Sequence, residues 1–242
     1  MRRKLKLSIN LICQIIMLPL SIPCKLEVCF FPRSEVIFNL CSQFIALLPG
    51  LPGSFLRRGF YTLTLEYCSP DCHIGFGAIF SHRATMVDSH VYIGNYALIG
   101  SARIGKHCLI GSRASILSGK VLHVVGDDGL WTPFSVDRLQ QVCLGENVWV
   151  GEGAIVVSNV GDNAKVGAGA VVTSPVKSSI IVTGNPARFV GKLDDSQHTT
   201  LTSPSTAPST APSTAPSTTS STSPPSASTR SPNKSEKTSP TL

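Results

Sequence analysis

The central part of this sequence carries almost no net charge, although the 242 residues together have a formal net charge of +7. Residues 1–50 hold six Lys or Arg and two Glu, and residues 200–242 hold three basic residues and one Glu, which leaves +1 for the core. The core therefore lacks the basic footprint of a nucleic-acid-binding surface. We expect no nucleic-acid partner.

The sequence also lacks a complete set of cysteines for a structural zinc site. Its eight cysteines are scattered, and Cys68 and Cys72 form a C-x3-C pair that no second pair follows. A zinc site built on such a pair needs a second pair of ligands. We therefore expect reduced thiols that are buried or close to a membrane.

Residues 196–242 contain almost no large apolar side chains. They are mostly Ser, Thr, Pro and Ala, and residues 204–215 read PSTAPSTAPSTA, a strict four-residue repeat. Too little apolar surface is available to offset the entropy of ordering such a segment. We expect a disordered tail that serves as a spacer or a glycosylated stalk and carries no chemistry.

Residues 1–50 are apolar and begin with a basic cluster. Four Lys or Arg among the first six residues precede an apolar run, and a second segment, SEVIFNLCSQFIALLPG, has apolar residues at helical spacing. A cleaved signal sequence is one alternative, although no small-x-small cleavage site follows the run. We favour two membrane-interface helices, or one helix that dips into the bilayer, held by anionic headgroups. The protein would then be cytoplasmic, and peripheral or anchored at the cytoplasmic face of the membrane.

The region from residue 74 to residue 192 repeats about every six residues. Aliphatic-Gly pairs recur at Ile93, Ile99, Ile104 and Ile110, and after an interruption the pattern resumes as LGENVW, VGEGAI, VGDNAK and VGAGAV. Neither the helix period of 3.6 nor the plain strand period of two gives this spacing. A short strand and a tight turn in each hexad, with three strands to a coil, would produce it. The sequence predicts a parallel β-helix with its leading aliphatic side chains pointing inward, entered through a helical cap at residues 51–73.

Several motifs resemble those of the hexapeptide-repeat acyltransferases, namely LPGLPGSFLRRGFY, IGFGAIFSH, VWVGEGAIV, VGAGAVVT and TGNPARFVGK. The resemblance covers about residues 51–192 and is greatest to the sugar O-acetyltransferases of exopolysaccharide synthesis, the colanic-acid type. It implies a left-handed β-helix, acetyl-CoA as co-substrate, and a homotrimer with each site between neighbouring β-helices. A related class, the gamma-type carbonic anhydrases, binds zinc through three histidines, two of them five residues apart. This sequence has no such pair, so we expect no metal.

The interruption of the repeat at residues 119–141 predicts a loop that leaves the β-helix, and such loops are commonly functional. His123 lies in this loop. Acyl transfer to a hydroxyl needs a base that accepts a proton near neutral pH, and histidine suits that role. We expect His123 to be the catalytic base, with Asp127 or Asp128 orienting its imidazole and backbone N–H groups stabilising the oxyanion.

The resemblance also implies cofactor contacts near the end of the repeat. Small residues in VGAGAVVT leave the backbone open to a pantetheine arm, and Arg188 matches a family position that binds a CoA phosphate. Relatives carry a lysine where Ser174 stands, and Lys177 or Lys192 could replace that charge. The expected cofactor-binding residues are Trp149, Glu152, Ala168, Gly169, Thr173, Arg188 and Lys192.

These inferences favour an acetyl-CoA-dependent O-acetyltransferase acting on a hydroxyl of a sugar or surface glycan in polysaccharide biosynthesis. One alternative is O-acetylation of serine or an antibiotic. Another is a β-helix scaffold without catalysis, although a scaffold needs neither His123 nor Arg188.

Overall fold

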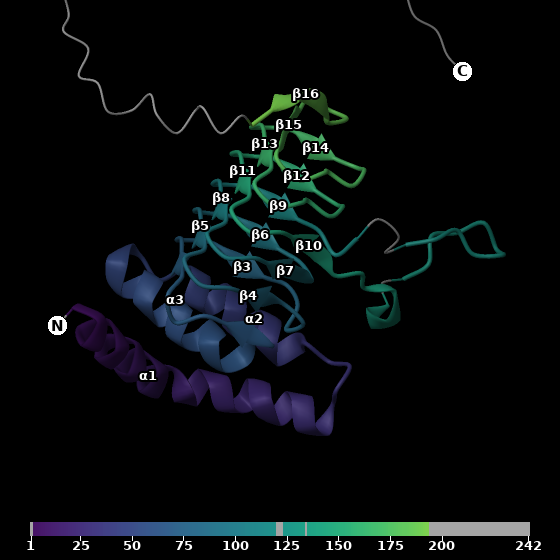
Figure 1. Cartoon of the computed structure of the whole chain (residues 1–242). Helices are drawn as coiled ribbons and strands as arrows, with labels where there is room; N and C mark the ends of the chain where they lie inside the picture. The colour runs from purple at the N-terminus through teal and green to yellow at the C-terminus, as the bar shows by residue number, and fades with distance from the viewer. Residues whose placement is uncertain (1, 120–122, 134, 194–242) are drawn as a thin grey trace, which may run out of the picture. The chain divides into compact units, whose positions relative to one another are not determined.

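The computed structural model describes residues 2–119, 123–133 and 135–193. It contains three N-terminal helices, Arg2–Phe30 (α1), Val36–Ala46 (α2) and Gly50–Thr64 (α3), followed by stacked coils of short strands (Figure 1). The tail expected at residues 196–242 lies outside the described residues. The expected fold class, a left-handed parallel β-helix of hexapeptide repeats with N-terminal helical segments, is confirmed.

Three sheets form the sides of the β-helix, and each coil contributes one strand to each side where the repeat is complete. The first sheet joins Tyr67–Cys68 (β1), Met86–Val87 (β4), Ala102–Ile104 (β7) and Val142–Leu144 (β10). The second sheet joins His73–Ile74 (β2), Tyr92–Ile93 (β5), Leu109–Ile110 (β8), Trp149–Val150 (β11), Lys165–Val166 (β13), Ile180–Thr183 (β15) and Arg188–Lys192 (β16). The third sheet joins Ile79–Phe80 (β3), Leu98–Ile99 (β6), Ser115–Ile116 (β9), Ile155–Val156 (β12) and Val171–Val172 (β14).

The aliphatic residue that leads each hexad lies in the core, as the repeat predicts. Ile93, Ile110 and Val150 stack in register along the second sheet and are fully buried. The residues four positions after each leading residue are buried at the corners: Val91, Ala97, Cys108, Ala114, Val148, Ala154, Ala164 and Ala170. Each coil therefore completes the core of the next, because no coil can bury its aliphatic side chains alone.

Tight turns at the corners need left-handed backbone conformations. At one corner His90, His107, Asn147, Asn163 and Ser179 all have φ between 55° and 62°. His90 and His107 stack with ring centres 4.7 Å apart and are turn residues, in agreement with their place in the hexads. Asn and His tolerate this conformation better than bulky residues.

The two ends of the β-helix differ from the sequence expectation. The first strand begins at Tyr67, seven residues before the expected start at residue 74, because YCSPDC supplies a coil strand without an Ile-Gly pair. At the other end, β15 and β16 pair antiparallel. That hairpin ends the stack of parallel strands.

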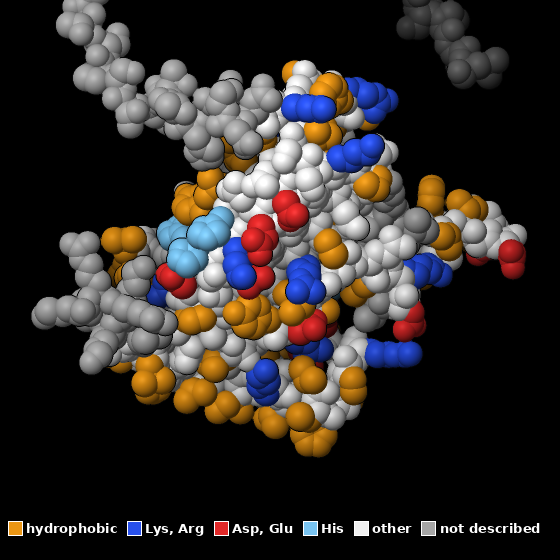
Figure 2. Space-filling model, in the orientation of Figure 1, with side chains coloured by type: hydrophobic (Ala, Val, Ile, Leu, Met, Phe, Trp, Pro, Cys, Tyr) orange, Lys and Arg blue, Asp and Glu red, His pale blue; other side chains and the backbone are white. Residues whose placement is uncertain are grey.

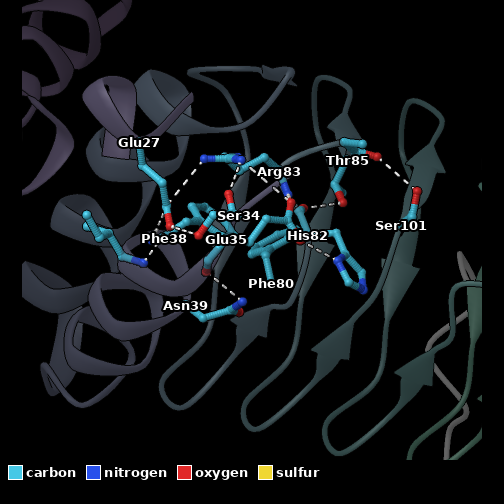
Figure 3. A network of polar contacts seen from close by, with 12 residues as sticks. Glu27, Ser34, Glu35, Phe38, Asn39, Phe80, His82, Arg83, Thr85 and Ser101 are labelled. Atoms are coloured by element: carbon cyan, nitrogen blue, oxygen red, sulfur yellow. Dashed lines mark hydrogen bonds and ion pairs between the residues drawn. The ribbon is translucent and has the colours of Figure 1, made fainter. Parts of the chain in front are cut away.

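A buried polar cluster, which we call the clasp, joins the helices to the first coils (Figure 3). Its members are Glu27, Ser34, Glu35, His82 and Arg83. The Glu27 carboxylate accepts hydrogen bonds from the Ile37 and Phe38 N–H groups at the start of α2, from the Ser34 hydroxyl and from Arg83.

Glu35 of the clasp accepts hydrogen bonds from Nδ1 of His82 at 2.7 Å and from the Arg83 N–H at 2.9 Å. Burial opposes ionisation of Glu35, but the hydrogen bonds from His82 and Arg83 and their charges outweigh it and lower its pKa. His82 thus binds the helices to the β-helix.

Candidate active site

The outer face of the second sheet carries a groove of about 690 Å³. In-register pairing stacks the outward side chains of successive coils, so Tyr92, Leu109, Trp149 and Lys165 form a ladder along one wall. The ammonium group of Lys165 lies 4.0 Å from the centre of the Trp149 ring. This cation–π contact places a positive charge on an otherwise apolar wall.

The turns that follow these strands form the opposite wall, through Gly111, Ser112, Gly151, Glu152, Gly167 and Ala168. A Cβ added to Gly151 would lie 2.4 Å from the Ala168 nitrogen, and one added to Gly167 would lie 2.5 Å from the Thr183 hydroxyl oxygen. These glycines therefore allow successive coils to stack closely. The backbone of the turns borders the groove as a result.

Three of the expected cofactor residues meet in this groove. Trp149 contributes its ring, Glu152 its exposed carboxylate and Ala168 its turn backbone. The Glu152 carboxylate lies 3.6 Å from the Arg113 guanidinium, and both side chains are exposed. The groove thus offers an aromatic surface, backbone groups and charges of both signs to a ligand.

The other four expected cofactor residues do not line the groove. Gly169 follows Ala168 in the turn with φ +65°, and an added Cβ there would meet open space. Thr173 follows β14 in the third sheet, and Arg188 and Lys192 stand at the two ends of β16. Gly169 thus lies beside the groove, and the structure places Thr173, Arg188 and Lys192 toward the last coil.

The loop after β9 holds His123 at the base of a small hairpin. The Val124 carbonyl accepts a hydrogen bond from the Thr132 N–H, and Val125 pairs antiparallel with Trp131. Nδ1 of His123, an exposed residue, lies 2.8 Å from the Thr132 carbonyl oxygen. A carbonyl only accepts, so Nδ1 carries the proton, and Nε2 of the neutral ring is left to accept one.

The structure gives Asp127 and Asp128 a different place from the one expected. The Asp128 carboxylate accepts a hydrogen bond from the Leu130 N–H, inside the turn of the hairpin. Asp127 is exposed in the same turn. The Thr132 carbonyl occupies the orienting position beside His123 that we expected one of these carboxylates to fill.

Sequence reasoning missed Thr132 and Arg138. Nη1 of Arg138 donates to the Thr132 hydroxyl, which also accepts a hydrogen bond from the Val124 N–H at 3.1 Å. The signal was present, since Gly-Asp-Asp-Gly at residues 126–129 between apolar residues is typical of a hairpin turn. Such a hairpin places residue 132 opposite residues 123 and 124.

His123 and the groove lie on different parts of one chain. The loop leaves after the third sheet and returns to the first sheet, whereas the groove lies on the second sheet (Figure 1). His123 is not among the described residues that line the groove. One chain therefore does not bring the expected base to the expected cofactor residues.

No group of three or more His, Cys, Asp or Glu side chains within residues 2–119, 123–133 and 135–193 is arranged to hold a metal ion. The Cys68 and Cys72 sulfurs lie 3.8 Å apart as buried free thiols. Hydrogen bonding to Cys72 and burial raise the pKa of Cys68, so this thiol stays protonated.

Comparison with known proteins supports the repeat. A family model described as the hexapeptide repeat of succinyl-transferase matches residues 101–119 and 141–174, on both sides of the loop. Acyl-[acyl-carrier-protein]–UDP-N-acetylglucosamine O-acyltransferase of Stenotrophomonas maltophilia (strain K279a) is 27% identical over 121 residues, which are 43% of this chain and 45% of the relative. The chain thus spans less than half the length of this curated relative.

The solved structures that match this chain include two sugar acetyltransferases. A maltose O-acetyltransferase from Clostridium difficile 630 is 16% identical, with a TM-score of 0.49 over 66% of this chain and 87% of that one. A galactoside acetyltransferase in complex with coenzyme A is 17% identical, with a TM-score of 0.48 over 68% of this chain and 83% of that one. The match to the family model supports the hexapeptide-repeat acyltransferase family for this chain.

Proposed function

We propose that this protein transfers an acetyl group from acetyl-CoA to a hydroxyl of a sugar or surface glycan. The observation that carries the proposal is the pairing of His123 with the Thr132 carbonyl. This contact gives an exposed imidazole the tautomer that a general base needs. The groove beside Trp149, Glu152 and Ala168 supplies a place for the pantetheine arm.

In the proposed reaction, Nε2 of His123 takes the proton of the acceptor hydroxyl while its oxygen attacks the thioester carbonyl carbon. A C–O bond forms, the tetrahedral intermediate collapses and the C–S bond breaks. The CoA sulfur leaves as a thiolate and receives the proton from the imidazolium. Backbone N–H groups stabilise the oxyanion. Every atom and proton is accounted for without a metal.

We propose that the site forms between two copies of the chain, in a homotrimer. The reason is geometric, since His123 and the groove lie on different sides of one β-helix. A rotational assembly would place the loop of one copy against the second sheet of the next. Arg188 and Lys192 lie toward the last coil, where they would meet the phosphates of the nucleotide.

The identity of the acyl donor has one specific alternative, which is an acylated acyl carrier protein. The curated relative is named for an acyl-carrier-protein donor, whereas the galactoside acetyltransferase structure holds coenzyme A. The colanic-acid type and its role in polysaccharide biosynthesis are proposals that rest on the sequence motifs.

The test is release of free thiol by the full-length protein in detergent, with acetyl-CoA or acetylated acyl carrier protein as donor and a panel of sugars, serine and antibiotics as acceptors. We expect turnover with acetyl-CoA and a sugar. His123→Ala should lower kcat by about 10²-fold to 10⁴-fold. His107→Ala removes an exposed turn histidine and should leave kcat unchanged.

An unchanged rate in the His123→Ala variant would eliminate His123 as the base. Transfer from acetylated acyl carrier protein but not from acetyl-CoA would show that the donor is the acyl carrier protein. Failure to bind acetyl-CoA in calorimetry, together with no transfer from either donor, would favour a scaffold.

A further inference from the structure

Helix α1 buries a side of mixed polarity, on which Asn10, Ser21 and Glu27 alternate with Cys13, Met17 and Cys24, and it exposes an apolar side. Asn10 and Glu27 are only 5% and 3% exposed, whereas Ile12 and Ile15 are 56% and 57% exposed. The hydrophobic effect turns an amphipathic helix the other way when its outer side faces water. This arrangement is therefore the one expected when the outer side faces an apolar medium.

Helix α2 continues the same pattern. Phe38, Ser42 and Ile45 pack toward the β-helix, and Val36, Leu40 and Phe44 point outward at a spacing of four residues. Figure 2 shows hydrophobic side chains gathered at the helical end of the molecule. We define the outer helical face by its exposed members: Leu11, Ile12, Ile15, Ile16, Leu18, Ile22, Leu26, Phe30, Phe31, Val36, Leu40, Phe44, Leu47 and Leu51.

The charges around this face are mostly positive. The two acidic residues among residues 8–65 are Glu27 and Glu35, and both turn inward to the clasp. Lys25 and Arg33 are exposed, and the chain begins with four further Lys or Arg before Leu7. Asp137 lies 3.5 Å from Arg33, with both side chains exposed, but the basic residues outnumber it. An apolar face edged mainly by cations complements an anionic lipid headgroup layer.

We propose that the outer helical face binds an anionic bilayer, with α1 lying in the plane of the interface. By length and composition, Ser8–Phe30 is able to cross a membrane. However, both ends of α1 are tied to the protein. Near its start, Asn10 accepts a hydrogen bond from Arg58, and near its end Glu27 joins the clasp. A spanning α1 would break these contacts and carry Glu27 into lipid, at a high cost.

The same contacts oppose a cleaved leader. Cys13 packs so closely on α3 that a Cβ added to Gly59 would lie 2.9 Å from the Cys13 carbonyl carbon. Removal of the first helix would expose this surface of α3 and would take the Asn10 side-chain oxygen from the Arg58 guanidinium. We infer that α1 stays with the mature protein as its lipid-facing layer.

The first test is flotation of the full-length protein with vesicles of phosphatidylcholine containing phosphatidylglycerol, against vesicles of phosphatidylcholine alone. The wild type should float with the anionic vesicles. Leu40→Asp combined with Phe44→Asp should lower the bound fraction by about tenfold, because two carboxylates would face the headgroups. The matched control is Phe189→Asp with Val190→Asp, which adds the same charge on exposed residues of β16 and should float like the wild type.

Circular dichroism of the variants checks that the fold is intact. The proposal is overturned by a wild type that stays with the free protein, or by a Leu40→Asp/Phe44→Asp variant that floats normally. It is also overturned if that variant binds vesicles normally but forms a smaller oligomer in light scattering. The outer helical face would then join copies of the chain.

A second test distinguishes an α1 that lies in the plane of the interface from an α1 that spans the bilayer. A membrane-impermeant maleimide added outside the vesicles should label both Ser8→Cys and the exposed native Cys29, since both ends of α1 would lie at one surface. Labelling of one end with protection of the other would show a spanning helix and refute the in-plane arrangement.

Discussion

Nδ1 of His123 lies 2.8 Å from the carbonyl oxygen of Thr132, nine residues further along the chain. The hairpin between them fixes which nitrogen of the imidazole carries the proton. A backbone carbonyl does not titrate, so the orientation of His123 does not depend on the protonation of a carboxylate partner. The position of the His123 imidazole depends instead on the hairpin.

Arg138→Leu should lower kcat by about tenfold and leave the KM for acetyl-CoA nearly unchanged. The Arg138 guanidinium donates to the Thr132 hydroxyl and so holds the strand that orients His123, while the groove lies on another sheet. Small displacements of a catalytic group lower the rate by such factors. Steady-state kinetics measure the split, and Arg138→Lys should recover part of kcat. A rise in KM with constant kcat would mean that Arg138 acts on binding.

Loss of a buried hexad residue should destabilise the β-helix. Ile110 is fully buried, and its neighbour Leu109 is exposed on the outer face. Ile110→Ala should lower the free energy of unfolding by about 3 kcal/mol, because a cavity forms between coils. Leu109→Ala should lower it by less than about 1 kcal/mol. Urea denaturation followed by circular dichroism measures both values, and equal losses would contradict the inward direction of Ile110.

The clasp should make stability depend on pH in the acid range. Burial opposes ionisation of Glu27, but hydrogen bonds from the Ile37 N–H, Ser34 and the Phe38 N–H, with the charge of Arg83, lower its pKa below 4.5. A carboxylate whose pKa is lower in the folded state stabilises the fold above its unfolded pKa. That stabilisation is fully present above about pH 4.5 and is lost as the pH falls through the lower folded value.

Glu27→Gln should therefore lower the free energy of unfolding by about 3 kcal/mol at pH 7, since it removes a buried charge that accepts four hydrogen bonds and is one of two carboxylates paired with Arg83. The loss should shrink as the pH falls below 4. Glu146→Gln breaks an exposed pair with Lys106 and should cost less than about 1 kcal/mol. Chemical denaturation at a series of pH values measures both variants. A loss for Glu27→Gln that stays constant with pH would exclude the clasp as its cause.

Membrane binding and catalysis should be linked by the acceptor. The helices contact β2 and β3 of the first coils, and parallel strands are spaced by about 4.8 Å. The groove spans β5 to β13, so it begins about one strand spacing beyond the helical layer. On anionic vesicles, turnover with a lipid-linked glycan should exceed turnover with the free glycan by about tenfold or more. Leu40→Asp with Phe44→Asp should remove this advantage and leave turnover of the free glycan unchanged.

The hexads predicted most of the fold because their signal is local. In every Ile-Gly pair from Ile93 to Ile110 the isoleucine is the buried last residue of a strand, and a local repeat can be read without knowing any partner. The clasp could not be predicted, since Glu27 and Arg83 are 56 residues apart and neither stands in a motif. Thr132 is an intermediate case, because its hairpin turn was visible although its contact with His123 was not.

The residues of the groove also divide into those that the sequence predicted and those that it did not. Glu152 and Ala168 occupy the same place in hexads of successive coils, and Trp149 precedes Glu152 on the same side, so the repeat alone aligns them. Arg188 belongs to the closing hairpin, where the hexad no longer fixes positions. Lys165 completes the aromatic wall through its contact with Trp149, yet in the sequence it is an ordinary outward residue of a hexad.

Complementation between two inactive variants tests the central claim most directly, namely that two copies of the chain share each site. His123→Ala lacks the base, and Ala168→Trp fills the groove. Co-expressed in equal amounts, they should recover about one quarter of wild-type turnover, because half of the loops and half of the grooves are intact and pair at random. A mixture as inactive as either variant alone would mean that base and groove act within one chain, and would contradict the account.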